Sequence, residues 1–225
     1  MKLNGIDRTA GNIGILLEGY LTQDTRLLEL HFAADSGIPD GKLLVHRLTG
    51  YEAINEGFRF EAECLSSDAF IPLKELEGVP LQVALLTDCG TRRQINAVVT
   101  EVRSEGADGS LAVYRLILEP ATAVLKLGQA SRVFLGQSYL QAALRILDEE
   151  IQNNPVFAAC MSIDNRCMGT FPAREFIFLC GESKWGFIKR CFAKAGVSFV
   201  FAPTKDGSPD FPQHTLILFN DLRDL

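Results

Sequence analysis

Apolar and charged residues alternate from residue 58 to residue 64, within the stretch 50–65. The apolar set is Phe58, Phe60, Ala62 and Cys64, and the charged set is Arg59, Glu61 and Glu63. A period of two places alternate side chains on opposite faces of a sheet, whereas a helical period would scatter both sets around a cylinder. The pattern therefore predicts a half-buried strand, with residues 55–57 supplying the turn that precedes it.

Further strands are predicted on both sides of this stretch. Short apolar or alternating runs, separated by turn-forming residues, occupy residues 25–32, 42–49 and 81–87. The runs 94–104 and 110–119 are rich in Val, Leu and Ile, and the loop 105–109 between them carries two glycines, which is typical of a hairpin. Pro120 ends the second run because proline has no N–H to donate to a ladder. Short strands at this spacing are typical of a barrel or a sandwich.

The pattern becomes partly helical after Pro120. Ser138 and Gln141 have the spacing of a capping box, which predicts a helix that ends near residue 152. A second helix is predicted after Ser183, whose hydroxyl suits an N-cap, and Gly196 is placed to end it. Further strands are predicted at residues 171–180, 197–202 and 215–219.

These elements predict a mainly β fold with an α+β insertion. Residues 1–120 would form a small β-barrel, and residues 121–213 would form an inserted α+β lobe. The last strand, near residues 214–221, is expected to return to the barrel and complete it, since an apolar strand needs a partner for its ladder.

Composition and charge narrow the classes of function. The chain has 225 residues, enough for one large domain or two small ones. A formal net charge of -6, with no basic cluster larger than the pair Arg92 and Arg93, argues against binding to nucleic acid. No apolar run approaches the roughly 18 residues that span a membrane, and the N-terminal residues lack the apolar region of a signal peptide.

The six cysteines are scattered along the chain and contain no CxxC pair. This usage suits free thiols in a reducing cytoplasm better than it suits a disulfide framework. We expect Cys64, Cys180 and Cys191 to be buried, because they fall at apolar positions of the predicted elements. Cys160 and Cys167, the closest pair, have a spacing that fits no zinc motif.

Other side chains that could carry chemistry have ordinary structural explanations. The three histidines, His31, His46 and His214, are isolated from one another, so neither a metal site nor a cofactor site is predicted. Glu61 and Glu63 lie two residues apart on one strand face, which is usual for solvated strand surface. Arg132 and Arg174 adjoin apolar runs, and we expect them to form structural ion pairs rather than a substrate clamp.

No catalytic residue is predicted. Ser183 lies between a strand and a helix, as the nucleophile of a hydrolase would, but Trp185 occupies the position where a GxSxG turn needs glycine. A helix cap explains Ser183 better. A hydrolase or other effector enzyme that uses Ser183 or a cysteine as nucleophile is the alternative to a structural role.

A series of short motifs resembles one family of proteins. The motifs, in order, are Thr-Arg-Leu-Leu-Glu-Leu from residue 25, the stretch from Leu48 to Phe60, Tyr-Arg-Leu-Ile-Leu-Glu-Pro from residue 114, Ser-Arg-Val-Phe from residue 131, Phe-Pro-Ala-Arg-Glu-Phe from residue 171, Glu182 with Ser183, Trp-Gly-Phe-Ile-Lys-Arg from residue 185 and Ala-Gly-Val-Ser-Phe-Val-Phe from residue 195. This order resembles that of VgrG proteins, the valine–glycine repeat spike proteins of type VI secretion. The resemblance extends from about Gln23 to Asp221.

The sequence departs from the family pattern at several positions. The family usually has His-Gly where this chain has Asn96 and Ala97, and a tryptophan soon after the position of Pro120. It commonly has Asp at the position of Lys184, and Glu-Glu-Gly where residues 194–196 read Lys-Ala-Gly. We expect these changes to affect the surface or local packing rather than the fold.

The resemblance implies a structural protein without catalytic, cofactor or metal residues. It implies a fold like the hub of a phage baseplate, in which a small β-barrel carries an α+β lobe. In the family three copies form a ring with pseudo-sixfold symmetry, which sits on a hexameric secretion tube protein (Hcp-like). A β-helical spike follows the hub, and some members carry effector proteins.

The resemblance also implies where the protein acts and how it assembles. Such a protein is cytoplasmic before the machine fires and is then secreted by the type VI machine without a signal peptide. The full-length protein is expected to be a trimer. We expect this 225-residue piece, with one barrel and no spike, to be monomeric or weakly associating, because persistent interfaces usually bury more than about 1,000 Å².

Overall fold

A computed structural model describes residue 23 and residues 26–107, 111–204 and 210–224. Its first half is a six-stranded antiparallel sheet with the spatial order β1-β4-β5-β6-β3-β2. The strands are β1 (Leu28–Phe32), β2 (Leu44–Ala53), β3 (Gly57–Ser66), β4 (Pro80–Leu86), β5 (Arg92–Ala107) and β6 (Ala112–Glu119). All the strands predicted before Pro120 are therefore present, although Thr25 and residues 108–110 of the predicted hairpin loop lie outside the described residues.

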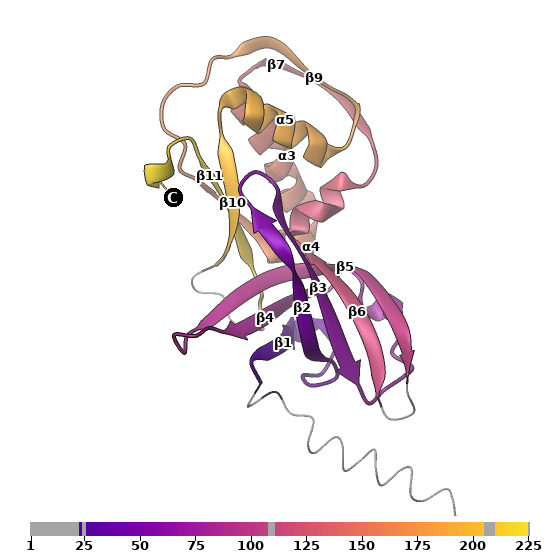
Figure 1. The fold of residues 1–225 in the computed structure, drawn as a ribbon. Helices are drawn as coiled ribbons and strands as arrows, with labels where there is room; N and C mark the ends of the chain where they lie inside the picture. Colours follow the sequence, from indigo (N-terminus) through magenta and orange to yellow (C-terminus); the bar gives the residue numbers. More distant parts are fainter. Residues whose placement is uncertain (1–22, 24–25, 108–110, 205–209, 225) are drawn as a thin grey trace, which may run out of the picture.

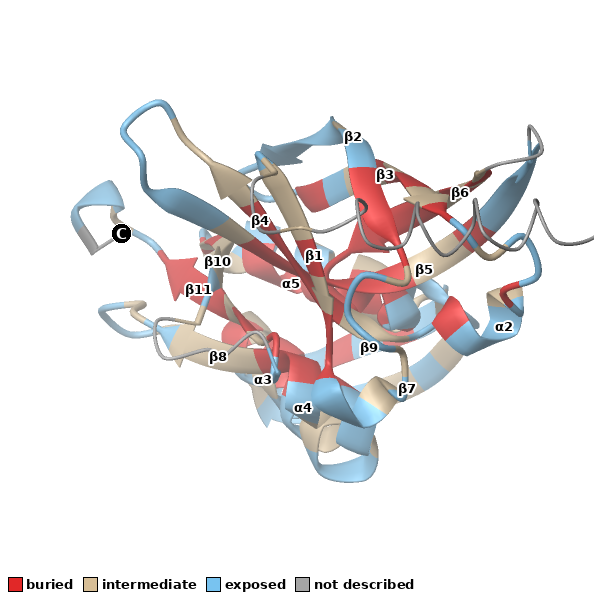
Figure 2. Cartoon of the chain, turned by 90° about the horizontal axis from the view of Figure 1, so that it is seen from below, coloured by how far each residue is buried: buried red, intermediate tan, exposed pale blue. Residues whose placement is uncertain are grey.

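The six-stranded sheet curls into a half-barrel (Figures 1 and 2). Its edge strands, β1 and β2, approach each other but are not paired by hydrogen bonds. The predicted alternation is confirmed in β3: Phe58, Ala62 and Cys64 are buried in the core enclosed by the curl. Arg59 faces outward, where its Nη1 lies 3.1 Å from Oε2 of Glu119. The period of two in the sequence thus determines which face of the sheet carries the core.

The outer edge of β1 is occupied by a side chain. The amide nitrogen Nε2 of Gln23 donates to the carbonyl oxygen of Leu30 at 2.9 Å. The backbone N–H of Leu30 donates in turn to Oε1 of Gln23, with an N–O distance of 2.6 Å. One side-chain amide therefore makes the pair of bonds that a neighbouring strand would make at this residue.

The second half, here called the lobe, extends from η2 to β11. A short 3-10 helix, η2 (Ala121–Lys126), leads from β6 into it. Its other elements are β7 (Ala130–Gln137), α3 (Tyr139–Asn153), α4 (Pro155–Cys160), β8 (Met161–Asn165), β9 (Arg174–Glu182), α5 (Lys184–Ala195), β10 (Ser198–Pro203) and β11 (His214–Phe219). β7 and β9 form a two-stranded antiparallel sheet, while β10, β11 and β8 form a three-stranded sheet.

The two predicted helices begin at the predicted caps. Ser138 Oγ accepts from the backbone N–H of Gln141 at 3.2 Å, and Gln141 Oε1 accepts from the N–H of Ser138 at 2.8 Å, which completes the capping box of α3. Ser183 Oγ caps α5 by accepting from the backbone N–H of Gly186, and Gly196 ends α5 with a φ of 69° that favours glycine.

Helix α5 joins the two sheets of the lobe. Phe187 stacks on Phe134 of β7, with ring centroids 5.3 Å apart. Trp185, on the same helix, meets Phe199 of β10 edge to face at 5.4 Å. Figure 1 shows α3 and α5 between the β7–β9 sheet and the three-stranded sheet. The apolar stripes of these helices therefore form the centre of a second core.

The prediction that the last strand completes the barrel is wrong. β11 pairs with β10 in antiparallel fashion on one side and with β8 in parallel fashion on the other. Both edges of its ladder are thus satisfied inside the lobe, and Leu216 and Leu218 are buried in the lobe core. The sequence pattern does not predict β8, the strand that offers β11 its second partner.

Candidate functional site

Ser183 is placed as a cap and not as an activated nucleophile. Its Oγ accepts from the backbone N–H of Gly186 at 3.1 Å. The hydroxyl therefore satisfies one of the free donors at the start of α5. The Cβ that an alanine would add at Gly186 meets this same Oγ at 3.1 Å, so glycine leaves room for the cap.

The acidic and basic residues considered as candidates for chemistry form structural contacts that are separate from one another. Glu61 Oε1 accepts from Arg115 Nη1 at 2.6 Å across β3 and β6. Arg132 makes two hydrogen bonds to Glu149, of 2.5 and 2.9 Å, which confirms a structural ion pair. Its guanidinium also lies over the ring of Phe134. Arg174 lies instead over the ring of Tyr139, 5.6 Å from its centroid, which is a cation–π contact.

The cysteines are all free thiols. Cys64 and Cys191 are buried as predicted, but Cys180 is exposed, so that part of the prediction is wrong. Cys160, for which burial was not predicted, is buried. Burial raises the pKa of Cys64 and of Cys160 to about 12, which disfavours the reactive thiolate in both.

The structure does not bring the histidines together. His31 lies beside Glu29 and Asp40 on the half-barrel, His46 is exposed on β2, and His214 is buried at the start of β11. Among the described residues, no three His, Cys, Asp or Glu side chains are grouped so that they could hold a metal ion.

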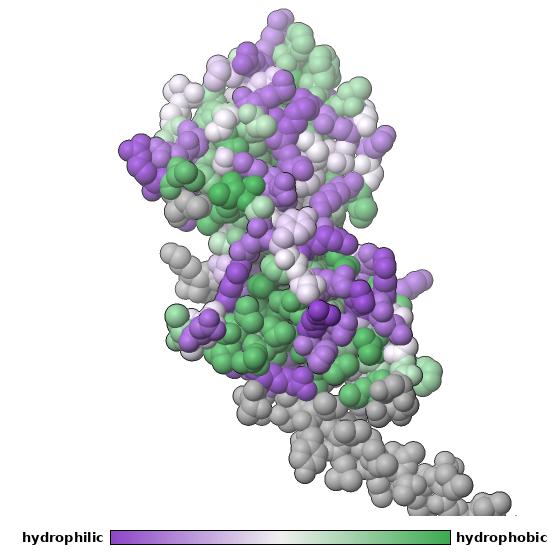
Figure 3. All heavy atoms as spheres, in the orientation of Figure 1, coloured by the Kyte–Doolittle hydropathy of each residue, from purple (hydrophilic) through white to green (hydrophobic). Residues whose placement is uncertain are grey.

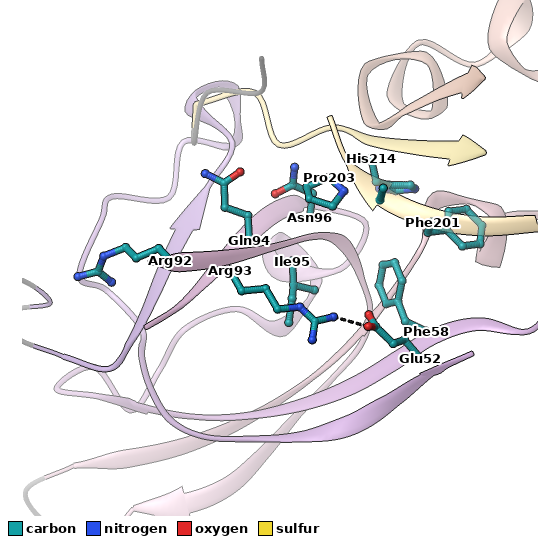
Figure 4. A pocket seen from close by; sticks show the side chains of 11 residues that line it. Glu52, Phe58, Arg92, Arg93, Gln94, Ile95, Asn96, Phe201, Pro203 and His214 are labelled. Atoms are coloured by element: carbon teal, nitrogen blue, oxygen red, sulfur yellow. Dashed lines mark hydrogen bonds and ion pairs between the residues drawn. The ribbon is translucent and has the colours of Figure 1, made fainter. Parts of the chain in front are cut away.

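A cavity of about 350 Å³ lies between the half-barrel and the lobe (Figure 4). Its half-barrel side is formed by Glu52, Phe58 and residues 92–96 of β5. Its lobe side is formed by Phe201, Ala202 and Pro203 of β10, together with His214. Figure 4 shows Arg93 reaching toward Glu52, with which it forms an ion pair.

His214 lines this cavity as a neutral side chain. It is 1% exposed, and its ring meets Phe58 and Phe201 edge to face. Burial lowers the pKa of His214 to about 3, because the charged form would lose its hydration, although the backbone of Asn96 acts in the opposite direction. Nδ1 makes no hydrogen bond of normal geometry within the described part of the chain.

The turn between β2 and β3 ties the half-barrel to the lobe. The backbone N–H of Asn55 donates to the carbonyl of Phe199 at 3.0 Å. The side-chain Oδ1 of Asn55 accepts from the N–H of Phe199 at 2.9 Å. Gly57, in the same turn, lies close to the ring of Phe201. This turn therefore fixes where β10 lies beside the half-barrel.

A buried amide pair makes a second link between the two parts. Gln82 Nε2 donates to Oδ1 of Asn96 at 3.0 Å across β4 and β5. Asn96 Nδ2 donates in turn to the carbonyl of Gln213 at 2.7 Å, just before β11. One of the departures from the family pattern is therefore an internal contact, as expected for a change of local packing.

The sequence pattern does not predict this junction. In the sequence Asn96 is only a departure from the family, and His214 is only an isolated histidine. The one available signal was that His214 directly precedes an apolar strand, where a polar side chain needs a buried partner.

A second surface feature is the outer face of the β7–β9 sheet. Val133 is paired with Phe178, and Leu135 with Phe176. All four side chains are at least half exposed, and the two phenylalanine rings lie 5.1 Å apart. Both faces of this small sheet are therefore apolar, although only one packs on the helices. Exposed apolar patches of this kind commonly mark interaction surfaces.

The half-barrel also exposes apolar surface. In the orientation of Figure 1, a continuous hydrophobic area lies on the half-barrel and is bordered by hydrophilic side chains (Figure 3). On the same face of the molecule, hydrophobic and hydrophilic residues are intermixed over the surface of the lobe. No described helix is both long enough and apolar enough to cross a membrane.

The family model described as phage tail baseplate hub (GPD) matches residues 51–225. The chain belongs to the phage tail baseplate hub family. This membership confirms the predicted hub-like fold class.

Curated relatives are spike proteins of type VI secretion. VgrG1b of Pseudomonas aeruginosa is 30% identical over 181 residues, which cover 80% of this chain and 23% of that protein. VgrG1c of the same organism is 23% identical over 197 residues, covering 88% of this chain and 25% of that protein. The chain thus spans about a quarter of the length of these relatives. The expected resemblance to VgrG proteins is confirmed.

Solved structures show the same fold. The E. coli c3393 protein is described as a component of the type VI secretion system with structural similarity to the T4 bacteriophage tail proteins gp27 and gp5. It matches with a TM-score of 0.71 at 21% identity, over 87% of this chain and 50% of that chain. A tail protein from Neisseria meningitidis MC58 matches with a TM-score of 0.51 at 14% identity, over 86% of this chain and 50% of that chain.

Proposed function

We propose that this chain is the N-terminal hub region of a type VI secretion spike protein and that its role is structural. The observation that carries the proposal is the family match over residues 51–225, joined to relatives that are spike proteins. The site geometry supports it, because Ser183 serves as a helix cap and the thiols of Cys64 and Cys160 have raised pKa values. No observation favours the hydrolase alternative.

The proposed assembly follows the family. In it, the full-length protein is a trimer that sits on the hexameric secretion tube protein (Hcp-like) and carries effector proteins. It is cytoplasmic before firing and is secreted by the type VI machine. We propose residues 1–120 as the first hub barrel and the elements from η2 onward as the inserted lobe, now including β11. The apolar outer face of β7–β9 supports a role in assembly.

A deletion and complementation experiment tests the structural role. Deleting the gene should abolish release of the tube protein into the medium, and the wild-type gene should restore release. Ser183→Ala should also restore it, because a structural hub needs only the fold. If a folded Ser183→Ala variant fails to restore release, the enzyme alternative replaces this proposal. If deletion leaves release unchanged, the assignment to the spike is wrong.

Light scattering tests the assembly. The 225-residue chain should be monomeric or weakly associating, while the full-length protein should be a stable trimer. A trimer of the 225-residue chain that persists on dilution would show that the half-barrel and lobe carry the trimer contacts. A full-length monomer would contradict the proposed assembly.

A further inference from the structure

One stretch of β5 has backbone groups that no neighbouring strand uses. β5 pairs with β4 from Arg92 to Val98. Its other neighbour, β6, pairs with it only from Val98 onward. In the described part of the chain, residues 92–97 therefore have a paired strand on one side only.

Two hydrogen bonds fix which residues face the free side. The N–H of Thr87 donates to the carbonyl of Thr91 at 2.8 Å, and the N–H of Val99 donates to the carbonyl of Val79 at 3.0 Å. Odd-numbered residues of this stretch are therefore the ones that bond toward β4. Along an antiparallel strand, the backbone N–H and C=O groups of successive residues point alternately to one side and to the other. The backbone N–H and C=O groups of the even-numbered residues, Gln94 among them, point to the free side.

This free edge borders the cavity of about 350 Å³ in Figure 4. β10, on the opposite side of the cavity, is the edge strand of its own sheet. The backbone N–H and C=O groups of Phe199 in β10 point toward Asn55, away from β11. The backbone groups of Phe201, two residues later, therefore point toward the half-barrel as well. The cavity thus lies between two strand edges.

The side chains around the cavity define what it would bind. Phe58 and Phe201, with centroids 5.9 Å apart, supply an apolar surface. Arg92 and Arg93 are neighbours on β5 and point to opposite faces of the sheet, where they pair with Glu29 and Glu52, respectively. A guanidinium has five N–H donors, more than these ion pairs use, so each arginine can bind a further carboxylate.

We propose that this cavity binds an extended segment of another protein, which adds to residues 92–96 of β5 as a further strand. Backbone bonds to Gln94 supply affinity, as in other complexes formed by strand addition. An acidic side chain of the segment meets Arg92, and a neighbouring apolar side chain meets Phe58 and Phe201. Alternation along a strand places these two side chains on opposite faces, one toward Arg92 and the other toward the aromatic rings.

The arginines also decide against a second copy of this chain as the partner. Charged side chains on a free edge protect it from pairing with an identical edge, because like charges repel. Where the two edges overlapped at residues 92 and 93, the arginines of one copy would lie beside those of the other. An acidic segment meets no such repulsion. The inference is independent of the proposed role in secretion.

Peptide titration of the full 225-residue chain tests the proposal. The probe is the acetylated and amidated pentapeptide Val-Glu-Val-Glu-Val, followed through backbone amide NMR shifts. We expect saturable shifts at Gln94 and Asn96, with a Kd of roughly 1 mM. The counterpart Val-Lys-Val-Lys-Val should not bind. Absence of saturable shifts, shifts confined to other surfaces, or equal binding of both peptides would overturn the proposal.

A matched pair of variants tests the strand geometry. Gln94→Pro removes the N–H that faces the cavity and leaves the bonds to β4 intact, because those come from odd-numbered residues. Gln94→Ala retains the N–H. We expect the proline variant to bind the acidic peptide at least about tenfold more weakly than the alanine variant. Equal binding by the two folded variants would refute strand addition.

Charge reversal provides a test that does not depend on proline being tolerated. Arg92→Glu, at an exposed position, should weaken binding of the acidic peptide and allow the lysine peptide to bind. An unchanged preference for the acidic peptide would rule out Arg92 as its partner and would overturn the assigned chemistry.

Discussion

The ring nitrogen Nε2 of His214 accepts a hydrogen bond from the backbone N–H of Ala121, with an N–N distance of 3.1 Å. The bond joins the start of β11 to the start of η2, two segments far apart in sequence. Because Nε2 is the acceptor, the proton of the neutral ring lies on Nδ1. A protonated ring could not accept this bond, so the junction depends on His214 remaining neutral.

Stability should therefore decrease in acid. The pKa of His214 falls from 6.5 to about 3 on folding, so the unfolded state binds the proton more readily and stability is lost as pH drops below 6.5. The loss from this one group should be about 2 kcal/mol between about pH 8 and about pH 5. Urea unfolding at the two pH values measures it.

The control for this prediction is a second histidine. His214→Gln should reduce the difference between the two pH values by about 2 kcal/mol. His46→Gln, at an exposed position, should leave the difference as it is in the wild type. If His214→Gln keeps the full difference, another group causes the acid sensitivity.

Asn55 should stabilise the folded state by more than its side-chain hydrogen bond alone. Its φ is 66°, in the left-handed region that costs other residues about 1 kcal/mol or more. Asn55→Gly retains that conformation and loses the side-chain hydrogen bond to Phe199, so it should destabilise the folded state by about 1 kcal/mol. Asn55→Ala should cost about 1 kcal/mol more, through the backbone. Urea midpoints that rank alanine equal to glycine would contradict the backbone contribution.

Because Ser183 is the N-cap of α5, its replacement should change stability. Ser183→Ala should destabilise by about 1 kcal/mol, because the N–H of Gly186 loses its acceptor. Ser183→Asp should remain close to the wild type, since aspartate is an equally good N-cap. Thermal or urea unfolding compares the three proteins. A loss in Ser183→Asp as large as in Ser183→Ala would argue against capping.

Five of the six cysteines should react in two groups. Cys89 and Cys180 are exposed and should react quickly with a thiol reagent near neutral pH. Cys64, Cys160 and Cys191 should react slowly, because burial raises their pKa values to about 12, about 12 and about 11. All six should react after denaturation. A shortfall would indicate a disulfide or a modified thiol, and fast reaction of Cys64 would contradict the burial.

Local patterns predicted most of the elements. The alternation from Phe58 to Cys64 fixed a strand and its buried face, because the pleat has a period of two. The caps of α3 and α5 were predictable because each depends on residues within three positions.

Non-local pairing could not be predicted in the same way. β8 carries no alternation that distinguishes it, and its parallel pairing with β11 joins residues more than fifty positions apart, as Ser162 and Thr215 show. The exposure of Cys180 was missed for a related reason. β9 is apolar on both faces, so the pattern could not show that only one face is covered.

The middle position of β11 in its sheet has a consequence for the order of folding. β8 and β10 do not touch each other through any ladder, and each gains its strand partner only when β11 arrives. The half-barrel, in contrast, has all its strands by Glu119. During synthesis from the N-terminus, the half-barrel can close while the lobe still waits for residues 214–219. Nascent chains that stall before His214 should therefore carry a protease-resistant half-barrel and an unprotected lobe.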